Sequence, residues 1–128
     1  MQAQNQYLAK NSEILMKTAS TAAGQRIFKY DGDITKGVTL HFNKLTVYLP
    51  AELFSAVLSK FSNKKVLGGF SMTEPPIDGL GYFVREYSKE QLDKSISPRY
   101  ASHIAAILRE EKLVEITKES RSTIITFK

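Results

Sequence analysis

The segment that most restricts the fold is residues 38–49, VTLHFNKLTVYL, where apolar and polar side chains alternate on both sides of a short turn. A two-residue turn at Asn43-Lys44 sets three apolar pairs opposite one another: Phe42 with Leu45, Leu40 with Val47, and Val38 with Leu49. The opposite face then carries Thr39, His41, Thr46 and Tyr48. Because a hairpin with one buried face requires this agreement between strands, the segment predicts a β-hairpin that packs on a core.

The neighbouring segments predict a strand before the hairpin and a helix after it. Residues 26–30 are typical of a strand, and Asp31-Gly32-Asp33 of the turn that closes it. Pro50 suits the first position of a helix over residues 51–61. The apolar positions of that helix share one face that should pack on the hairpin: Leu53, Phe54, Val57, Leu58 and Phe61.

Residues 65–87 predict two strands joined by an irregular loop. The first strand, 65–72, is broken at Gly68-Gly69, which indicates a bulge or a close backbone approach. Two prolines and two glycines make 73–81 a loop, and 82–87 (YFVREY) then predicts the second strand. Three aromatic residues here are candidates for a small-molecule pocket, with core and turn roles as the alternative: Phe70, Tyr82 and Phe83.

The N-terminal residues 4–19 predict a helix with a thin apolar stripe that ends before Gly24. Such a helix would dock on the body, pair with a second copy to form a homodimer, or fray.

The C-terminal third predicts a short helix, a tight turn, a longer helix and a hairpin. Ser88 fits the capping-box spacing before a helix of residues 89–94, and Ser97-Pro98 fits the start of a helix over 98–111. Residues 113–117 and 122–127 then form a hairpin around the polar turn 118–121.

This order resembles the end of winged helix-turn-helix DNA-binding proteins over about residues 88–128, SKEQLDKSISPRYASHIAAILREEKLVEITKESRSTIITFK. The apolar positions that carry the resemblance are Leu92, Ile96, Ile104, Leu108, Leu113 and Val114. Winged helices also need a preceding helix, and here a strand, a loop and another strand separate 51–61 from the pair. The segment is therefore either an elaborated winged helix or part of a different α+β sheet.

The resemblance implies that 98–111 is a recognition helix whose outward face enters the major groove of DNA. The residues that would contact DNA are Arg99, Ser102 and His103 on that helix, Lys118 and Arg121 at the wing tip, and Lys89 and Lys94 on the first helix. The alternative is that Arg99, His103 and Arg109 form the solvated face of an amphipathic helix.

The composition favours a soluble protein with an acidic partner. The net charge of +5 and pI of about 9.4 mildly favour nucleic acid, although residues 65–128 contribute only +1. There is no cysteine, and no apolar run suits a membrane span or an export signal, so we expect a cytoplasmic protein without disulfides or membrane contact.

Little in the sequence indicates chemistry. His41 and His103 lack the spacing of metal ligands, and Asp31 and Asp33 suit a turn better than a cation site. We therefore expect no catalytic residue, no metal and no cofactor.

Together these features predict one α+β domain, with an N-terminal helix or arm (1–24), an α+β body (25–87) and a winged-helix-like segment (88–128). The leading hypothesis is a DNA-binding accessory or regulatory protein. One alternative is a non-enzymatic module that binds a small molecule or a protein. Another is a single-stranded nucleic-acid binder that uses a polar sheet face with Tyr48, His41, Lys29, Lys36 and Lys44.

Overall fold

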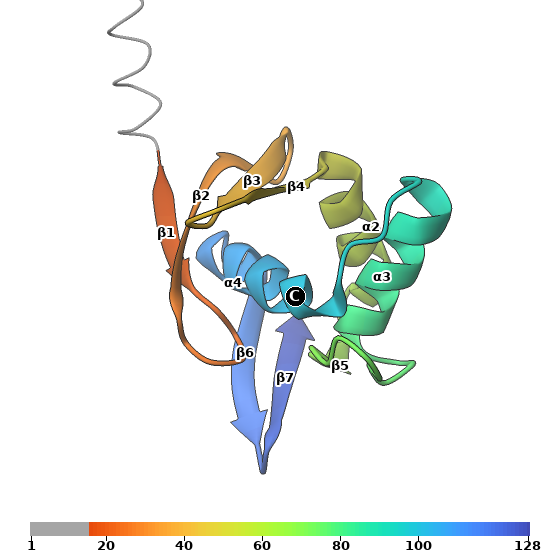
Figure 1. Cartoon of the computed structure of the whole chain (residues 1–128). Coiled ribbons are helices and arrows are strands. Elements are labelled where there is room, and N and C mark those ends of the chain that lie inside the picture. Colours follow the sequence, from red (N-terminus) through yellow and green to blue (C-terminus); the bar gives the residue numbers. More distant parts are fainter. Residues whose placement is uncertain (1–15) are drawn as a thin grey trace, which may run out of the picture.

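A computed structural model describes residues 16–128, in which two antiparallel sheets lie around a set of helices (Figure 1). The expected α+β class is therefore confirmed.

The N-terminal sheet contains the predicted hairpin. Its four strands are antiparallel in the order β1-β2-β3-β4, with β1 at Lys17–Ser20, β2 at Ile27–Asp33, β3 at Gly37–His41 and β4 at Thr46–Leu49. The expected register is confirmed, because Val38 pairs with Leu49 and Leu40 with Val47. Leu45 at the tip is the exception to the buried face, with 53% of its surface exposed.

Two predictions in the N-terminal part are wrong. Lys17–Ser20 is an edge strand paired with β2, whereas the predicted helix ran to residue 19; the rest of that helix lies outside the described residues. Strand β2 also continues to Asp33, so the turn follows Asp31-Gly32-Asp33 instead of coinciding with it. Asp33 Oδ1 closes this turn by accepting hydrogen bonds from the backbone of Thr35 at 2.8 Å and of Lys36 at 3.1 Å.

Helix α2 (Ala51–Phe61) follows as predicted and leads through the strand β5 (Lys65–Leu67) to the Pro/Gly loop. The predicted strand 65–72 is too long, because β5 ends before Gly68. The close backbone approach expected near Gly68-Gly69 is present. A Cβ atom on Gly81 would lie 1.9 Å from the Gly69 carbonyl oxygen, so the loop and the next helix fit together only without a side chain there.

The predicted strand 82–87 is wrong: together with the first residues of the predicted helix 89–94 it belongs to one helix, α3 (Leu80–Gln91), which ends three residues before the predicted end. Leu80, Val84 and Ser88 are buried four residues apart, while Phe83 and Tyr87 pack against the core from positions between them. This helical spacing runs through the predicted boundary at Ser88, and the aromatic and β-branched composition of YFVREY favoured a strand.

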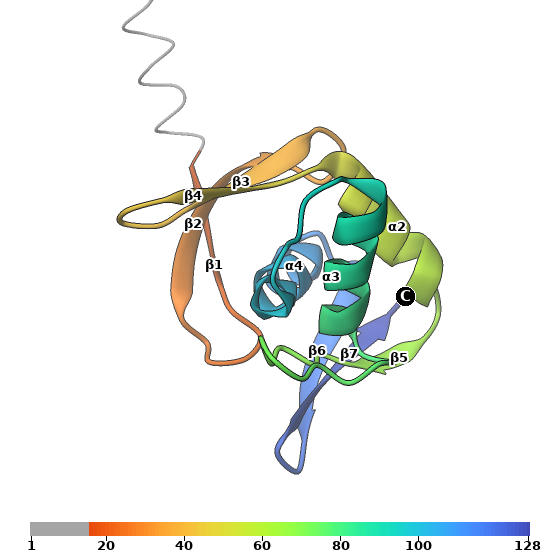
Figure 2. The same ribbon diagram turned by 45° about the vertical axis from the view of Figure 1, so that its right-hand side comes forward.

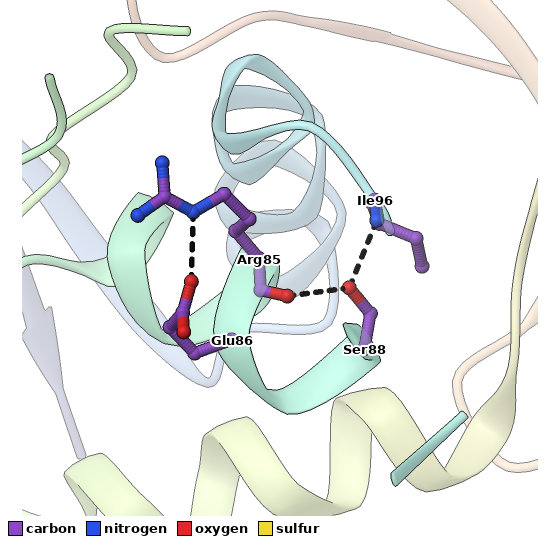
Figure 3. Close-up of polar contacts among 4 residues, drawn as sticks. All are labelled: Arg85, Glu86, Ser88 and Ile96. Atoms are coloured by element: carbon purple, nitrogen blue, oxygen red, sulfur yellow. Dashed lines mark hydrogen bonds and ion pairs between the residues drawn. The ribbon is translucent and has the colours of Figure 1, made fainter. Parts of the chain in front are cut away.

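Ser88 consequently has a different role from the predicted cap. Its hydroxyl donates to the Arg85 carbonyl oxygen at 3.0 Å and accepts from the Ile96 backbone N–H at 2.8 Å (Figure 3). The fully buried side chain thereby ties the last turn of α3 to the connection that follows it.

The C-terminal elements match their prediction closely. Ser97 Oγ accepts from the Arg99 backbone N–H at 3.3 Å at the start of a 3₁₀ turn, η1 (Pro98–Tyr100), which continues into α4 (Ala101–Glu110). Strands β6 (Val114–Glu119) and β7 (Ser122–Phe127) form the hairpin. With β5 they make a second sheet in the order β5-β7-β6.

Helix α4 lies at the centre of the molecule, with the N-terminal sheet on one side, α2 and α3 on another, and the second sheet beyond it (Figures 1 and 2). All eight residues from 101 to 108 are buried. A helix that is apolar on nearly every side is expected inside a core. Both sheets and all three described helices contribute to that core.

Candidate functional site

The two polar residues that we expected on the outward face of α4 are covered by the N-terminal sheet. Ser102 is 3% exposed. Its hydroxyl accepts from the Ala23 backbone N–H at 2.8 Å, and its carbonyl oxygen accepts from the Ala22 backbone N–H at 3.3 Å. The predicted exposure of Ser102 is therefore wrong, because the segment after β1 bonds along this side of the helix.

His103 is also buried, contrary to the prediction, with 8% of its surface exposed. Its ring centroid lies 4.7 Å from that of Phe28, 5.6 Å from Phe42 and 5.4 Å from Tyr100. Burial lowers the pKa of His103 to about 4, and the Arg99 charge acts in the same direction. The imidazole is therefore neutral at pH 7, and its Nδ1 has no hydrogen-bond partner among residues 16–128.

A groove of about 870 Å³ separates the N-terminal sheet from the start of α4; we call it the sheet–helix groove. Its charged side chains are all cationic: Arg26, Lys29 and Arg99. No carboxylate lines the groove within the described part of the chain. His41 lines the groove, and its Nε2 lies 2.7 Å from Asp31 Oδ2. Asp31 itself does not line the groove.

A smaller groove of about 320 Å³ adjoins it beside the β6–β7 hairpin; we call it the wing groove. Ala23 and Phe70 line both grooves. Lys118 and Arg121 line the wing groove, and Lys118 Nζ donates to the Ala23 carbonyl oxygen at 3.1 Å. We define the basic face as the five cationic residues of the two grooves: Arg26, Lys29, Arg99, Lys118 and Arg121.

The structure brings together five of the seven predicted DNA-contacting residues, because Arg99, Ser102, His103, Lys118 and Arg121 line these grooves. Lys89 and Lys94 lie apart from them. Lys94 Nζ donates to the Tyr48 carbonyl oxygen at 3.4 Å and sits 5.9 Å from the Tyr48 ring centroid. Arg26 was not among the predicted residues, because its position depends on how the N-terminal sheet docks.

The predicted pocket residues separate into two places. Tyr82 and Phe83 line a hollow of about 940 Å³ together with Phe61 and Val66, whereas Phe70 faces the two grooves of the basic face. Lysines and carboxylates both line the larger hollow, and Lys65 Nζ lies 3.3 Å from Glu119 Oε1 there.

The polar face of the N-terminal sheet offers little stacking surface. Tyr48 is 47% exposed, but Lys94 lies over its ring. His41 is paired with Asp31.

Across residues 16–128, no three His, Asp or Glu side chains are close enough to hold a metal ion. The helices described in that range are all too short or too polar to cross a membrane. Comparison of the chain with protein-family models, with curated proteins and with solved structures gives no match in any of the three.

Proposed function

We propose that the protein binds nucleic acid and that residues 51–128 form a winged helix-turn-helix unit. The order of elements supports this, since a helix, a strand, two further helices and a hairpin follow one another, and β5 joins the hairpin in the order β5-β7-β6. The segment that stood against the resemblance, 82–87, belongs to helix α3. Helices α2, α3 and α4 then supply the three-helix core that such a unit needs.

The proposed contact surface differs from that of a recognition helix. Groove insertion requires an outward face on the second helix of the pair, and the N-terminal sheet covers that face of α4. In addition, Arg109 Nη2 donates to the Ser20 carbonyl oxygen at 2.8 Å, which ties the far end of α4 to β1. We therefore place the contact on the basic face.

The observation that carries the proposal is that two adjoining grooves gather five cationic side chains and no carboxylate. The N-terminal sheet, the start of α4 and the β6–β7 hairpin each contribute to this surface. A surface that carries several cations and no carboxylate attracts a phosphate backbone, releases its counterions and requires no particular base sequence.

The test is a binding titration of labelled duplex and single-stranded oligonucleotides over a series of salt concentrations. We expect affinity to fall steeply with salt. Each of the variants Arg99→Ala, Lys118→Ala and Arg121→Ala should weaken binding and reduce the salt slope by about one for each phosphate that is no longer neutralised.

The matched control is Lys64→Ala, which removes one positive charge from the separate hollow beside Tyr82. It should leave affinity and slope close to those of the wild type. Absence of binding at low salt, or equal losses in the control and the basic-face variants, would contradict the proposal.

A module that binds a protein or a small molecule is the second candidate. It is favoured by the hollow of about 940 Å³ with aromatic walls and by Ile77 at its rim, which is 77% exposed. A ligand whose binding is lost in Tyr82→Ala but retained in Arg121→Ala would favour this function over nucleic-acid binding.

A further inference from the structure

The sheet–helix groove is lined by aromatic rings as well as by cations. Phe42 and Phe70 are half-buried and line the groove, so part of each ring is accessible from it. We call these two rings the aromatic floor. The groove volume of about 870 Å³ lies in the range of about 300–1,000 Å³ that is usual for small-molecule sites. A planar ring of the size of a nucleobase fits such a space.

Two side chains with free hydrogen-bonding capacity also line the groove, and we call them the polar edge. Neutral His103 carries one donor and one acceptor; its Nδ1 is a buried atom without a hydrogen bond to a residue in 16–128, so a ligand reaches it only by entering between the side chains that cover it. The Asn43 amide, at the turn of the hairpin, has two donors and an acceptor and likewise forms no such bond. Amide and imidazole groups match the donors and acceptors at the edge of a nucleobase.

We propose that the sheet–helix groove holds one nucleoside phosphate unit, with its base on the aromatic floor, its base edge at the polar edge and its phosphate at Arg26 and Arg99. This proposal rests on the proposed function, since the same cations serve both. It adds that the bound nucleic acid presents an unpaired base. The unit is either a nucleotide of a single strand or a free mononucleotide, which share this chemistry.

We expect an unpaired base because the two rings of the aromatic floor are half-buried side chains that line a groove. A base within a duplex is stacked and paired, and would have to leave the helix at a cost of a few kcal/mol to reach Phe42. Single strands present their bases without this cost, and stacking on an aromatic side chain is tolerant of sequence. We therefore expect single strands to bind more tightly than a duplex of the same length.

The experiment compares two labelled single strands of equal length on the full chain, one of deoxyadenylate and one abasic, by fluorescence anisotropy at fixed salt. The two strands carry the same phosphates, so any difference comes from the bases. We expect the deoxyadenylate strand to bind about tenfold more tightly. Adenosine monophosphate should displace it, whereas ribose phosphate at the same concentration should not.

Two variants locate the effect in the groove. Asn43→Ala changes an exposed turn residue and Phe70→Leu keeps an apolar side chain of similar volume, so neither threatens the fold. Both should reduce the preference for the deoxyadenylate strand and leave the affinity for the abasic strand unchanged. Phe83→Leu, in the separate hollow, is the matched control and should keep the full preference.

The outcomes separate the two proposals. Equal affinity of the wild type for both strands overturns the nucleotide site and leaves backbone binding intact. If neither strand binds at low salt, nucleic-acid binding is overturned. Binding of adenosine monophosphate that Asn43→Ala weakens would then support the groove as a site for a free nucleotide. If adenosine monophosphate does not bind either, the nucleotide site is overturned as well.

Discussion

In the structure the His103 side chain is buried, whereas the sequence pattern predicts that it is exposed to solvent. On a helical wheel it lies opposite Ile104 and Leu108, which predicts solvent exposure. In the structure that side of α4 faces Phe28 and Phe42, and the imidazole is held between aromatic rings. Its lowered pKa follows from this burial.

The burial of His103 predicts a pH-dependent stability. The imidazole has a pKa near 6.5 in the unfolded chain and about 4 in the folded one, so the unfolded chain takes up the proton first as the pH falls. The free energy of unfolding should therefore be at its full value above pH 6.5 and fall below it, by about 2 kcal/mol at pH 5.

Urea unfolding at pH 7, 6 and 5 measures this loss. In His103→Leu the fall over this range should be largely absent, because the buried titrating group is gone. A fall of the same size in His103→Leu and in the wild type would show that other groups cause it.

At the scale of elements, several local patterns predicted the structure correctly, whereas the composition of 82–87 favoured a strand where the structure has a helix. The register of the β3–β4 hairpin, the N-cap at Ser97 and the closing hairpin all depend on contacts within a few residues, and all are confirmed. Strand β1 was missed because it exists only by pairing with β2. The cations Arg99, Lys118 and Arg121 could be identified from the sequence, but their meeting with Arg26 depends on the docking of a distant sheet.

The two hydrogen bonds of the Ser88 hydroxyl, which join α3 to the connection before α4, should contribute to the free energy of unfolding. Ser88→Ala would leave the buried Ile96 backbone N–H without its acceptor, which should lower the free energy of unfolding by about 1–3 kcal/mol. Urea unfolding at pH 7 gives this difference directly. Ser95→Ala, seven residues later and exposed, is the control and should change the stability by less than about 0.5 kcal/mol. Equal effects of the two substitutions would mean that the Ser88 hydrogen bonds contribute nothing.

At the scale of the whole molecule, α4 packs between the two sheets, and their buried residues form one core. Residues of the N-terminal sheet such as Val38 and Leu40 belong to the same buried cluster as Leu108 and Ile125. A cluster that spans both sheets should unfold as one unit, so we expect residues 16–128 to behave as a single cooperative domain.

Leu40 and Leu45 test this expectation within one hairpin. Leu40 is fully buried, so Leu40→Ala should destabilise the protein by about 2–5 kcal/mol, whereas Leu45→Ala at the exposed tip should have little effect. Hydrogen exchange should show the Leu40→Ala loss in β7 as well as in β3. A loss confined to the N-terminal sheet would indicate two independently folding parts.

The covered side of α4 also gives a way to judge other chains that share the order of elements in residues 51–128. In a chain that lacks the preceding four strands, we expect exposure at the positions of Ser102 and His103 and at those one helical turn further, Ala106 and Ile107, which are all buried here. Long charged side chains should then occupy the last two, as in a helix that reads a DNA groove. Small or aliphatic residues at both would mark a chain in which, as in this one, the rest of the molecule covers that side of the helix.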